Sequence, residues 1–153
     1  MRRLVVLSAL MLASLGGAAS ASAQSLPSFT VGDAAILGPV HVRGAVADVH
    51  VRYSCVGGNH LWVSVKQSAS GAIDPAIAGD GSGFGGIAAT WWQSHRGSFT
   101  CDGKRHVQWF TVDTVEPGSR GVLRKGSAWV QFCVTTEDAL IAVRMQWSDV
   151  VVN

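Results

Sequence analysis

Charged side chains are scarce in this sequence, where they make up 14% of the residues, and no basic run stands out. Two of the 12 Lys and Arg residues, Arg2 and Arg3, lie at the extreme N-terminus, and the remaining ones are balanced by 10 Asp and Glu residues. Nucleic-acid-binding proteins carry a clustered basic patch or stripe, so we expect no nucleic-acid partner. Arg120, Arg124 and Lys125 do stand close together, and we interpret them as the solvated tip of a hairpin loop.

Long hydrophobic runs are lacking after the first residues. The one long apolar run, residues 4–15, follows two arginines and precedes small residues that end in the sequence ASA at 21–23. It is shorter than the ~20 residues that a transmembrane helix needs, and the three parts together are typical of a secretory signal peptide. We therefore expect residues 1–23 to be removed on export. The mature chain is then predicted to have no membrane span and to be secreted, into the medium or to the cell wall.

Recognised catalytic and cofactor-binding motifs are missing. The Gly-rich stretch GDGSGFGG at 79–86 lacks the Lys-Ser/Thr of a phosphate-binding loop, and no switch from strand to helix surrounds it. We interpret the wider segment 68–86 as a mobile loop or a connection between sheets. The histidines belong to no nucleophile motif, and the acids Asp102, Asp113 and Glu116 are scattered. We expect no enzymatic activity and no cofactor, although a Ser-His-Asp set assembled from distant positions stays open.

The sequence also lacks the periodicity of amphipathic helices, and its apolar residues follow a strand-like pattern instead. Apolar and polar residues alternate in a way that is typical of half-buried strands, over residues 47–55, 60–67, 106–113, 127–136 and 140–152. Several short strands separated by turn residues favour an all-β sandwich. We expect residues 34–153 to form that single domain, after a lead-in at 24–33 that is flexible or an edge strand.

Alternation also assigns faces to individual strands. In residues 47–55, the inward face is predicted to carry Val49, Val51, Tyr53 and Cys55. In residues 60–67, Leu61, Val63 and Val65 are predicted to face inward, and Trp62, Ser64 and Lys66 to face outward. Residues 106–113 have apolar residues on both faces, which indicates a central strand.

Two similar stretches, SCVGGNH at 54–60 and TCDGKRH at 100–106, raise the question of a metal site. Each places a Cys at the end of one strand and a His at the start of the next. If the two turns meet, Cys55, His60, Cys101 and His106 form a Cys2His2 set of the kind that zinc prefers.

Three arguments favour a disulfide over zinc. Known structural zinc sites use other spacings, neighbouring thiols of an exported protein oxidise, and the glycines have a sufficient explanation as turn residues. We therefore predict a Cys55–Cys101 disulfide and no metal, with a pairing that uses Cys133 still open. Cys133 is then a buried free thiol, or alternatively the partner in an intermolecular disulfide.

Tryptophan is abundant, with six residues in the chain. Most of them are expected in the core. Trp62 lies on a polar strand face, and the adjacent Trp91 and Trp92 must point to opposite faces, so these three are the possible ligand contacts. The predicted function is an extracellular binding or interaction protein whose partner is an unknown protein or glycan. Alternatives are a carbohydrate-binding module that uses exposed Trp, and a secreted inhibitor of an extracellular hydrolase.

The order of these motifs resembles that in a group of uncharacterised small secreted proteins of actinobacteria. The shared features are a Y-x-C strand end (Tyr53, Cys55), a valine-rich strand that ends in Gln67, a C-D-G turn before a Trp-containing strand, and a Gly-x-Ala strand (Gly126, Ala128). The resemblance implies an immunoglobulin-like antiparallel β-sandwich of about seven or eight strands with Cys55 paired to Cys101. It implies no catalytic or binding residues. Members often carry a second Cys pair near the C-terminal hairpin, where this chain has only Cys133.

Overall fold

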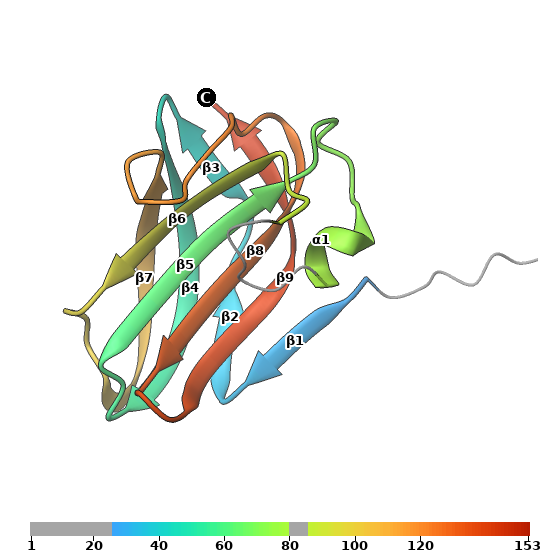
Figure 1. Cartoon of the computed structure of the whole chain (residues 1–153). Helices are drawn as coiled ribbons and strands as arrows, with labels where there is room; N and C mark the ends of the chain where they lie inside the picture. Colours follow the sequence, from blue (N-terminus) through green and yellow to red (C-terminus); the bar gives the residue numbers. More distant parts are fainter. Residues whose placement is uncertain (1–25, 80–85) are drawn as a thin grey trace, which may run out of the picture.

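The computed structural model describes residues 26–79 and 86–153, and the predicted signal peptide lies outside them. The described part contains nine β-strands and one short helix (Figure 1). The elements are β1 Ser28–Val31, β2 Asp33–Ile36, β3 Val40–Arg43, β4 Val46–Val56, β5 His60–Gln67, α1 Pro75–Gly79, β6 Thr90–Arg96, β7 Asp102–Asp113, β8 Gly126–Thr135 and β9 Leu140–Val152. The predicted all-β fold is confirmed, and β1 falls within the lead-in, where it pairs with β9 as an edge strand.

The strands lie in two layers that join at their edges. The front layer in Figure 1 holds β6, β5, β8, β9 and β1, and the back layer holds β7, β4, β2 and β3. Because β3 also pairs with β9, and β6 with β7, seven strands form a closed ring, with β1 and β2 as additions to β9 and β4. All of these pairings are antiparallel except that of β3 with β9.

Side chains from both layers fill the space between them. The predicted inward face of β4 is confirmed, because Val49, Val51 and Tyr53 are fully buried and Cys55 is 5% exposed. They pack with inward residues of β5 and β8 in one core cluster. Burying an aliphatic side chain of this size contributes about 1.5–3 kcal/mol, so the alternating strands supply most of the stability of the fold.

The outward faces of β5 and β8 differ from the sequence-based expectation. Ser64 and Lys66, predicted to face solvent, are 0% and 1% exposed. A second layer of side chains covers this face, because Ile77 of α1 and Ala88 pack on Trp129 of β8 in a small cluster of their own. The amine of Lys66 lies 5.0 Å from the ring centroid of Trp91. The connection before β6 therefore turns an open sheet face into a partly covered one.

β7 is less central than its sequence indicates. It pairs with β4 along nearly its whole length, but with β6 only through Gln93 and Asp113. On its outward face Val107 and Trp109 are 54% and 53% exposed, whereas Phe110 and Val112 point into the core. The apolar residues on its outward face therefore lie at the surface and are not covered by a second layer of side chains.

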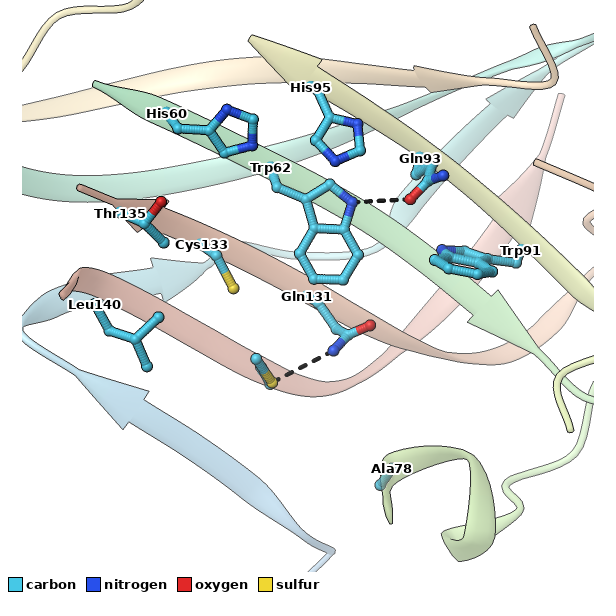
Figure 2. A pocket seen from close by; sticks show the side chains of 11 residues that line it. His60, Trp62, Ala78, Trp91, Gln93, His95, Gln131, Cys133, Thr135 and Leu140 are labelled. Carbon is cyan, nitrogen blue, oxygen red and sulfur yellow. Dashed lines mark hydrogen bonds between the residues drawn. The ribbon is translucent and has the colours of Figure 1, made fainter. Parts of the chain in front are cut away.

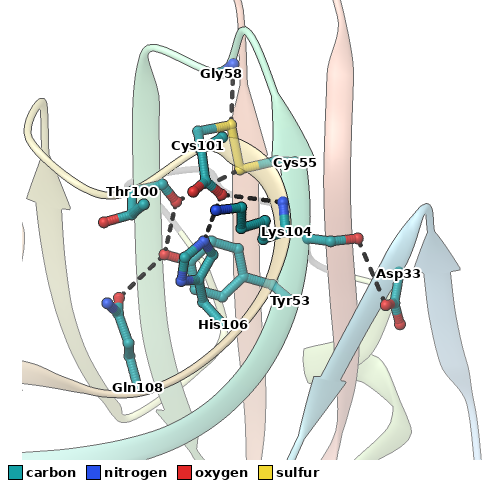
Figure 3. A network of polar contacts seen from close by, with 11 residues as sticks. Asp33, Tyr53, Cys55, Gly58, Thr100, Cys101, Lys104, His106 and Gln108 are labelled. Carbon is teal, nitrogen blue, oxygen red and sulfur yellow. Dashed lines mark hydrogen bonds and ion pairs between the residues drawn. A yellow bond between two sulfur atoms is a disulfide. The ribbon is translucent and has the colours of Figure 1, made fainter.

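The two similar stretches are joined by the predicted disulfide, which is confirmed. The prediction that both are turns is wrong for the second stretch, because Cys101 precedes β7 and residues 102–106 belong to that strand. Cys55 and Cys101 are bonded with Cα atoms 4.9 Å apart (Figure 3). The N–H of Gly58 donates to the Cys101 sulfur at 3.2 Å, and a Cβ at Gly58 would come 2.4 Å from the side chain of Val134. The bond joins residues 46 positions apart, and closing a loop of this length contributes about 4 kcal/mol in the chain-entropy description. Cys133 is a free, buried cysteine.

Among the described residues, no helix combines the length and the apolar character that crossing a membrane requires.

Candidate functional site

A pocket of about 550 Å³ opens on the outward face of the front layer. We call it the outer pocket (Figure 2). Its lining comes from β5, β6, β8, β9 and α1, and consists of His60, Trp62, Ala78, Trp91, Gln93, His95, Gln131, Cys133, Thr135, Leu140 and Met145. Among the described residues, this lining set contains no carboxylate, guanidinium or ammonium group.

The strand register explains why these residues meet. Trp62 of β5 pairs with His95 of β6 on one side and with Cys133 of β8 on the other. Two residues further along, Ser64 of β5 stands between Gln93 and Gln131 in the same way. Because side chains two residues apart share a face, the pocket consists of successive rows across three strands.

Hydrogen bonds fix the polar side chains in these rows. The indole N–H of Trp62 donates to Oε1 of Gln93 at 3.0 Å, and Nε2 of Gln93 donates to the carbonyl of Pro117 at 2.6 Å. The hydroxyl of Ser64 donates to Oε1 of Gln131 at 3.0 Å. Side chains locked in this way lose little rotamer freedom when a ligand binds, so the pocket is pre-organised.

Two histidines stand at the mouth of the pocket. The rings of His60 and His95 have centroids 5.2 Å apart and lie above Trp62 in Figure 2. Nδ1 of His95 lies 3.0 Å from Oε1 of Glu116, and its ring is 6.2 Å from that of Trp62. Strand periodicity places His60 and Trp62 on one face of β5, but the contact with His95 requires knowledge of the β5–β6 register.

The third cysteine contributes to the floor of the same pocket. Cys133 is 6% exposed, and burial raises the pKa of its thiol to about 11. A thiol is nucleophilic and metal-binding only as the thiolate, so at neutral pH this side chain acts as a small apolar group.

The three predicted ligand-contact tryptophans have different environments. Trp62 is half-buried in the outer pocket. Trp91 is 1% exposed at the pocket wall, and Trp92 is 2% exposed in the main core, where its indole N–H donates to the carbonyl of Gly121 at 3.1 Å. Both Trp91 and Trp92 are therefore buried, and among these three residues only Trp62 offers a partly exposed ring.

An exposed tryptophan outside the predicted ligand contacts lies on the back layer. Trp109 stacks on His50 with centroids 4.2 Å apart and planes 8° apart, and His41 meets it edge-on at 5.7 Å. The alternation in β7 groups Trp109 with Val107, but it does not show which face of the strand is outside.

The alternative zinc set is wrong. Cys55 and Cys101 are bonded to each other, which removes both thiolates. His60 meets His95 at the outer pocket, whereas Nε2 of His106 lies 2.7 Å from a carboxylate oxygen of Asp102 (Figure 3). This hydrogen bond, together with one from the backbone of Lys104, lowers the pKa of Asp102. In the described ranges, three or more potential metal-ligating side chains do not gather at any point.

Histidine and carboxylate side chains do converge, in the pairs His95–Glu116 and His106–Asp102. A hydrolytic triad also requires a nucleophile within hydrogen-bonding distance of the imidazole. Within residues 26–79 and 86–153, neither histidine forms a hydrogen bond with a serine, threonine or cysteine side chain. In both pairs the carboxylate instead holds the imidazole ring in one orientation.

The loop that contains Arg120 is anchored and does not project as a hairpin tip. Its backbone exchanges hydrogen bonds of 2.9 and 2.8 Å with Trp91, and its guanidinium donates to the carbonyls of Gly86 and Ala88 at 3.0 and 3.2 Å. Arg124 and Lys125, further along the loop, are exposed as expected.

No protein family model, no curated protein and no solved structure matches this chain.

Proposed function

We propose that this protein is a secreted, non-enzymatic binding protein that holds a neutral, hydroxyl-rich ligand, of which saccharides are the principal class, in the outer pocket. The observation that carries the proposal is the fixed Trp62 indole, which is half-buried among amide, imidazole and hydroxyl groups. Aromatic rings offer an apolar face to such a ligand, and a few polar groups set its orientation.

The lining supports a neutral ligand. Its polar members are neutral amides, a hydroxyl and imidazoles, and its apolar members include Trp62, Leu140 and Met145. A charged organic ligand would lose its hydration without gaining a partner of opposite charge among these lining groups. A volume of about 550 Å³ lies within the range of small-molecule sites.

The strand order supports an immunoglobulin-like sandwich as the finer description of the fold. In such domains strands A, B and E share one sheet and strands C, F and G the other. The same neighbours result when β4, β5, β7, β8 and β9 are taken as B, C, E, F and G, with β2 in the place of A. The disulfide departs from the pattern, since it joins the adjacent ends of β4 and β7 where antibody domains join B to F.

Three features support export. They are the signal-peptide pattern of the first 23 residues, the intramolecular disulfide, which persists in oxidising surroundings, and the motifs that resemble secreted actinobacterial proteins. The extracellular medium or the cell wall is the location that fits them together.

Depletion of the purified mature protein by insoluble cellulose, chitin and peptidoglycan tests the proposed ligand class. We expect one of these materials to remove the wild type from solution, and Trp62→Ala to stay in solution because the stacking surface is lost. Trp109→Ala is the matched control, since it removes an exposed tryptophan from the opposite layer and should bind like the wild type. Failure of all three materials, or loss of binding only in Trp109→Ala, would contradict the proposal.

A further inference from the structure

We propose that His60 and His95 form a two-imidazole site for a divalent first-row transition-metal ion, with copper(II) the most tightly bound and Glu116 as a positioning residue. The two histidines come from neighbouring strands and meet at the mouth of the outer pocket. The proposed saccharide ligand plays no part in this inference, so the two proposals can fail separately.

The distance between the rings suits joint coordination. A metal ion binds an imidazole nitrogen at ~2.1 Å, and that nitrogen lies about 1.2 Å from its ring centroid, so two imidazoles on one ion at a tetrahedral angle have centroids roughly 5.3 Å apart. The centroids of His60 and His95 are 5.2 Å apart, with the planes tilted by 39°. The two strands therefore already hold the rings at the separation that joint coordination requires.

Glu116 gives His95 the arrangement found at metal-ligating histidines. Such histidines hydrogen-bond one ring nitrogen to a carboxylate, which fixes the ring and raises the basicity of the other nitrogen. Here Nδ1 of His95 is engaged by Oε1 of Glu116 at 3.0 Å, which leaves Nε2 for a ligand. The carboxylate also places a negative charge beside the site. Glu116 is itself held by its backbone N–H, which donates to Oδ1 of Asp113 at 3.1 Å.

The site is accessible, and its remaining coordination positions face solvent. The side chain of His95 is 41% exposed, and His60 lies at the exposed start of β5. In the described part of the chain, the ring of His60 contacts the ring of His95 and forms no hydrogen bond or ion pair. Two protein ligands leave positions for water or for a donor group in the pocket, as at other open metal sites.

The ligand type decides which ion binds most tightly. Imidazole nitrogens bind copper, nickel and zinc ions. The affinity of such sites is higher for copper(II) than for nickel(II) or zinc(II). Copper(II) chloride is therefore the primary probe and zinc chloride the weaker comparison.

The proposal is tested by equilibrium dialysis of the mature protein against copper(II) chloride, with tryptophan fluorescence as a second readout. We expect one copper ion per chain and quenching of emission, because Trp62 lies beside the site. Glu116→Gln should weaken binding by about 10-fold, because only the orientation of His95 is lost. His60→Gln and His95→Gln each remove a ligand and should weaken binding by more than that. His41→Gln, which removes a histidine from the opposite layer, should bind like the wild type.

Both ligand positions are on the surface, so the variants should keep the thermal midpoint of the wild type, and this is measured first. Unchanged stoichiometry and affinity in the His60→Gln/His95→Gln double variant would overturn the proposal. The absence of saturable copper binding in the wild type would overturn it as well. A roughly 10-fold weaker binding in Glu116→Gln with an unchanged thermal midpoint would support the positioning role, because a residue that only maintained the fold would alter stability.

Discussion

The thiol of Cys133 lies on the outward face of β8, beside Trp62 and Gln131 in the outer pocket. Its surroundings are largely apolar, and burial raises its pKa from 9.0 to about 11. The folded protein therefore keeps this thiol protonated over a pH range in which an unfolded chain would ionise it. A buried cysteine of this kind is a packing residue whose chemistry becomes visible on unfolding.

We predict a loss of stability between pH 9 and pH 11 that depends on Cys133. Above the unfolded pKa the unfolded state binds fewer protons than the folded state, so the free energy of unfolding falls as the pH rises. The full shift corresponds to about 3 kcal/mol, of which about 2 kcal/mol is lost by about pH 10.5. The check is a urea titration at about pH 8 and about pH 10.5, on either side of the unfolded pKa, for the wild type and Cys133→Ala. The decrease should be smaller in the variant, and an equal decrease in both proteins would show that other groups cause it.

Gly121 illustrates how the loop between β7 and β8 is fitted to β6. It adopts a positive φ of +74°, and a Cβ there would lie 2.5 Å from the carbonyl oxygen of Ala89. Its own carbonyl accepts from the Trp92 indole at 3.1 Å, and the Thr90 hydroxyl donates to the carbonyl of Val122 at 3.0 Å. A side chain at position 121 would separate these partners.

We predict that Gly121→Ala lowers the free energy of unfolding by at least about 2 kcal/mol, because backbone strain is combined with a steric clash. Gly44→Ala is the matched control, since Gly44 has a similar φ of +62° but no atom lies within 4 Å of the position that a Cβ would take there. That variant bears the strain alone, about 1 kcal/mol. Denaturation in urea measures both. Equal losses of unfolding free energy in the two variants would mean that the loop around residue 121 relieves the clash without an energetic cost.

The predictable part of each element is the part that strand alternation controls. The inward faces of β4 and β5 can be predicted from periodicity alone. Alternate residues of a strand share one face, and burying that face removes Val51 and Val63 from water. The covered outward face of β5 escapes such a prediction because the residues that cover it are remote in sequence. Ser64 and Lys66 are buried by tertiary packing around α1 and Trp129. Such packing leaves no periodic pattern in the sequence of β5.

The same limit applies to the candidate site. Trp62 can be identified from the sequence because it is aromatic on a polar strand face, and the pairing of Cys55 with Cys101 is suggested by the two similar stretches that contain them. The meeting of His60 with His95 depends on β5 and β6 becoming neighbours across a long connection, in a register that only their pairing sets. The exposure of Trp109 escapes prediction because both faces of its strand carry apolar residues.

At the scale of the whole molecule, the ring of seven strands is unevenly closed. β5, β8 and β9 are paired along most of their lengths, whereas β6 and β7 share the single pair Gln93–Asp113. The side chain of Gln93 reinforces this seam through the carbonyl of Pro117 at 2.6 Å, and its backbone N–H donates to the hydroxyl of Ser119 at 3.3 Å. Few backbone hydrogen bonds therefore resist separation of the two layers on this side.

We predict that the ring opens first between β6 and β7, ahead of global unfolding. Regions with few protected backbone hydrogen bonds open locally at a lower free energy than the core. The amides of β6 that do not bond to β5, such as that of Gln93, should therefore exchange with deuterium faster than those of β8. Hydrogen exchange followed by mass spectrometry in increasing, sub-denaturing urea measures this difference. Gln93→Ala should accelerate exchange in β6 and leave β8 near its wild-type rate, because the amide bridge to Pro117 is lost while the β5–β8 pairing remains. If β6 and β8 exchange at the same rate at every urea concentration, the ring opens as one unit, and the seam has no separate stability.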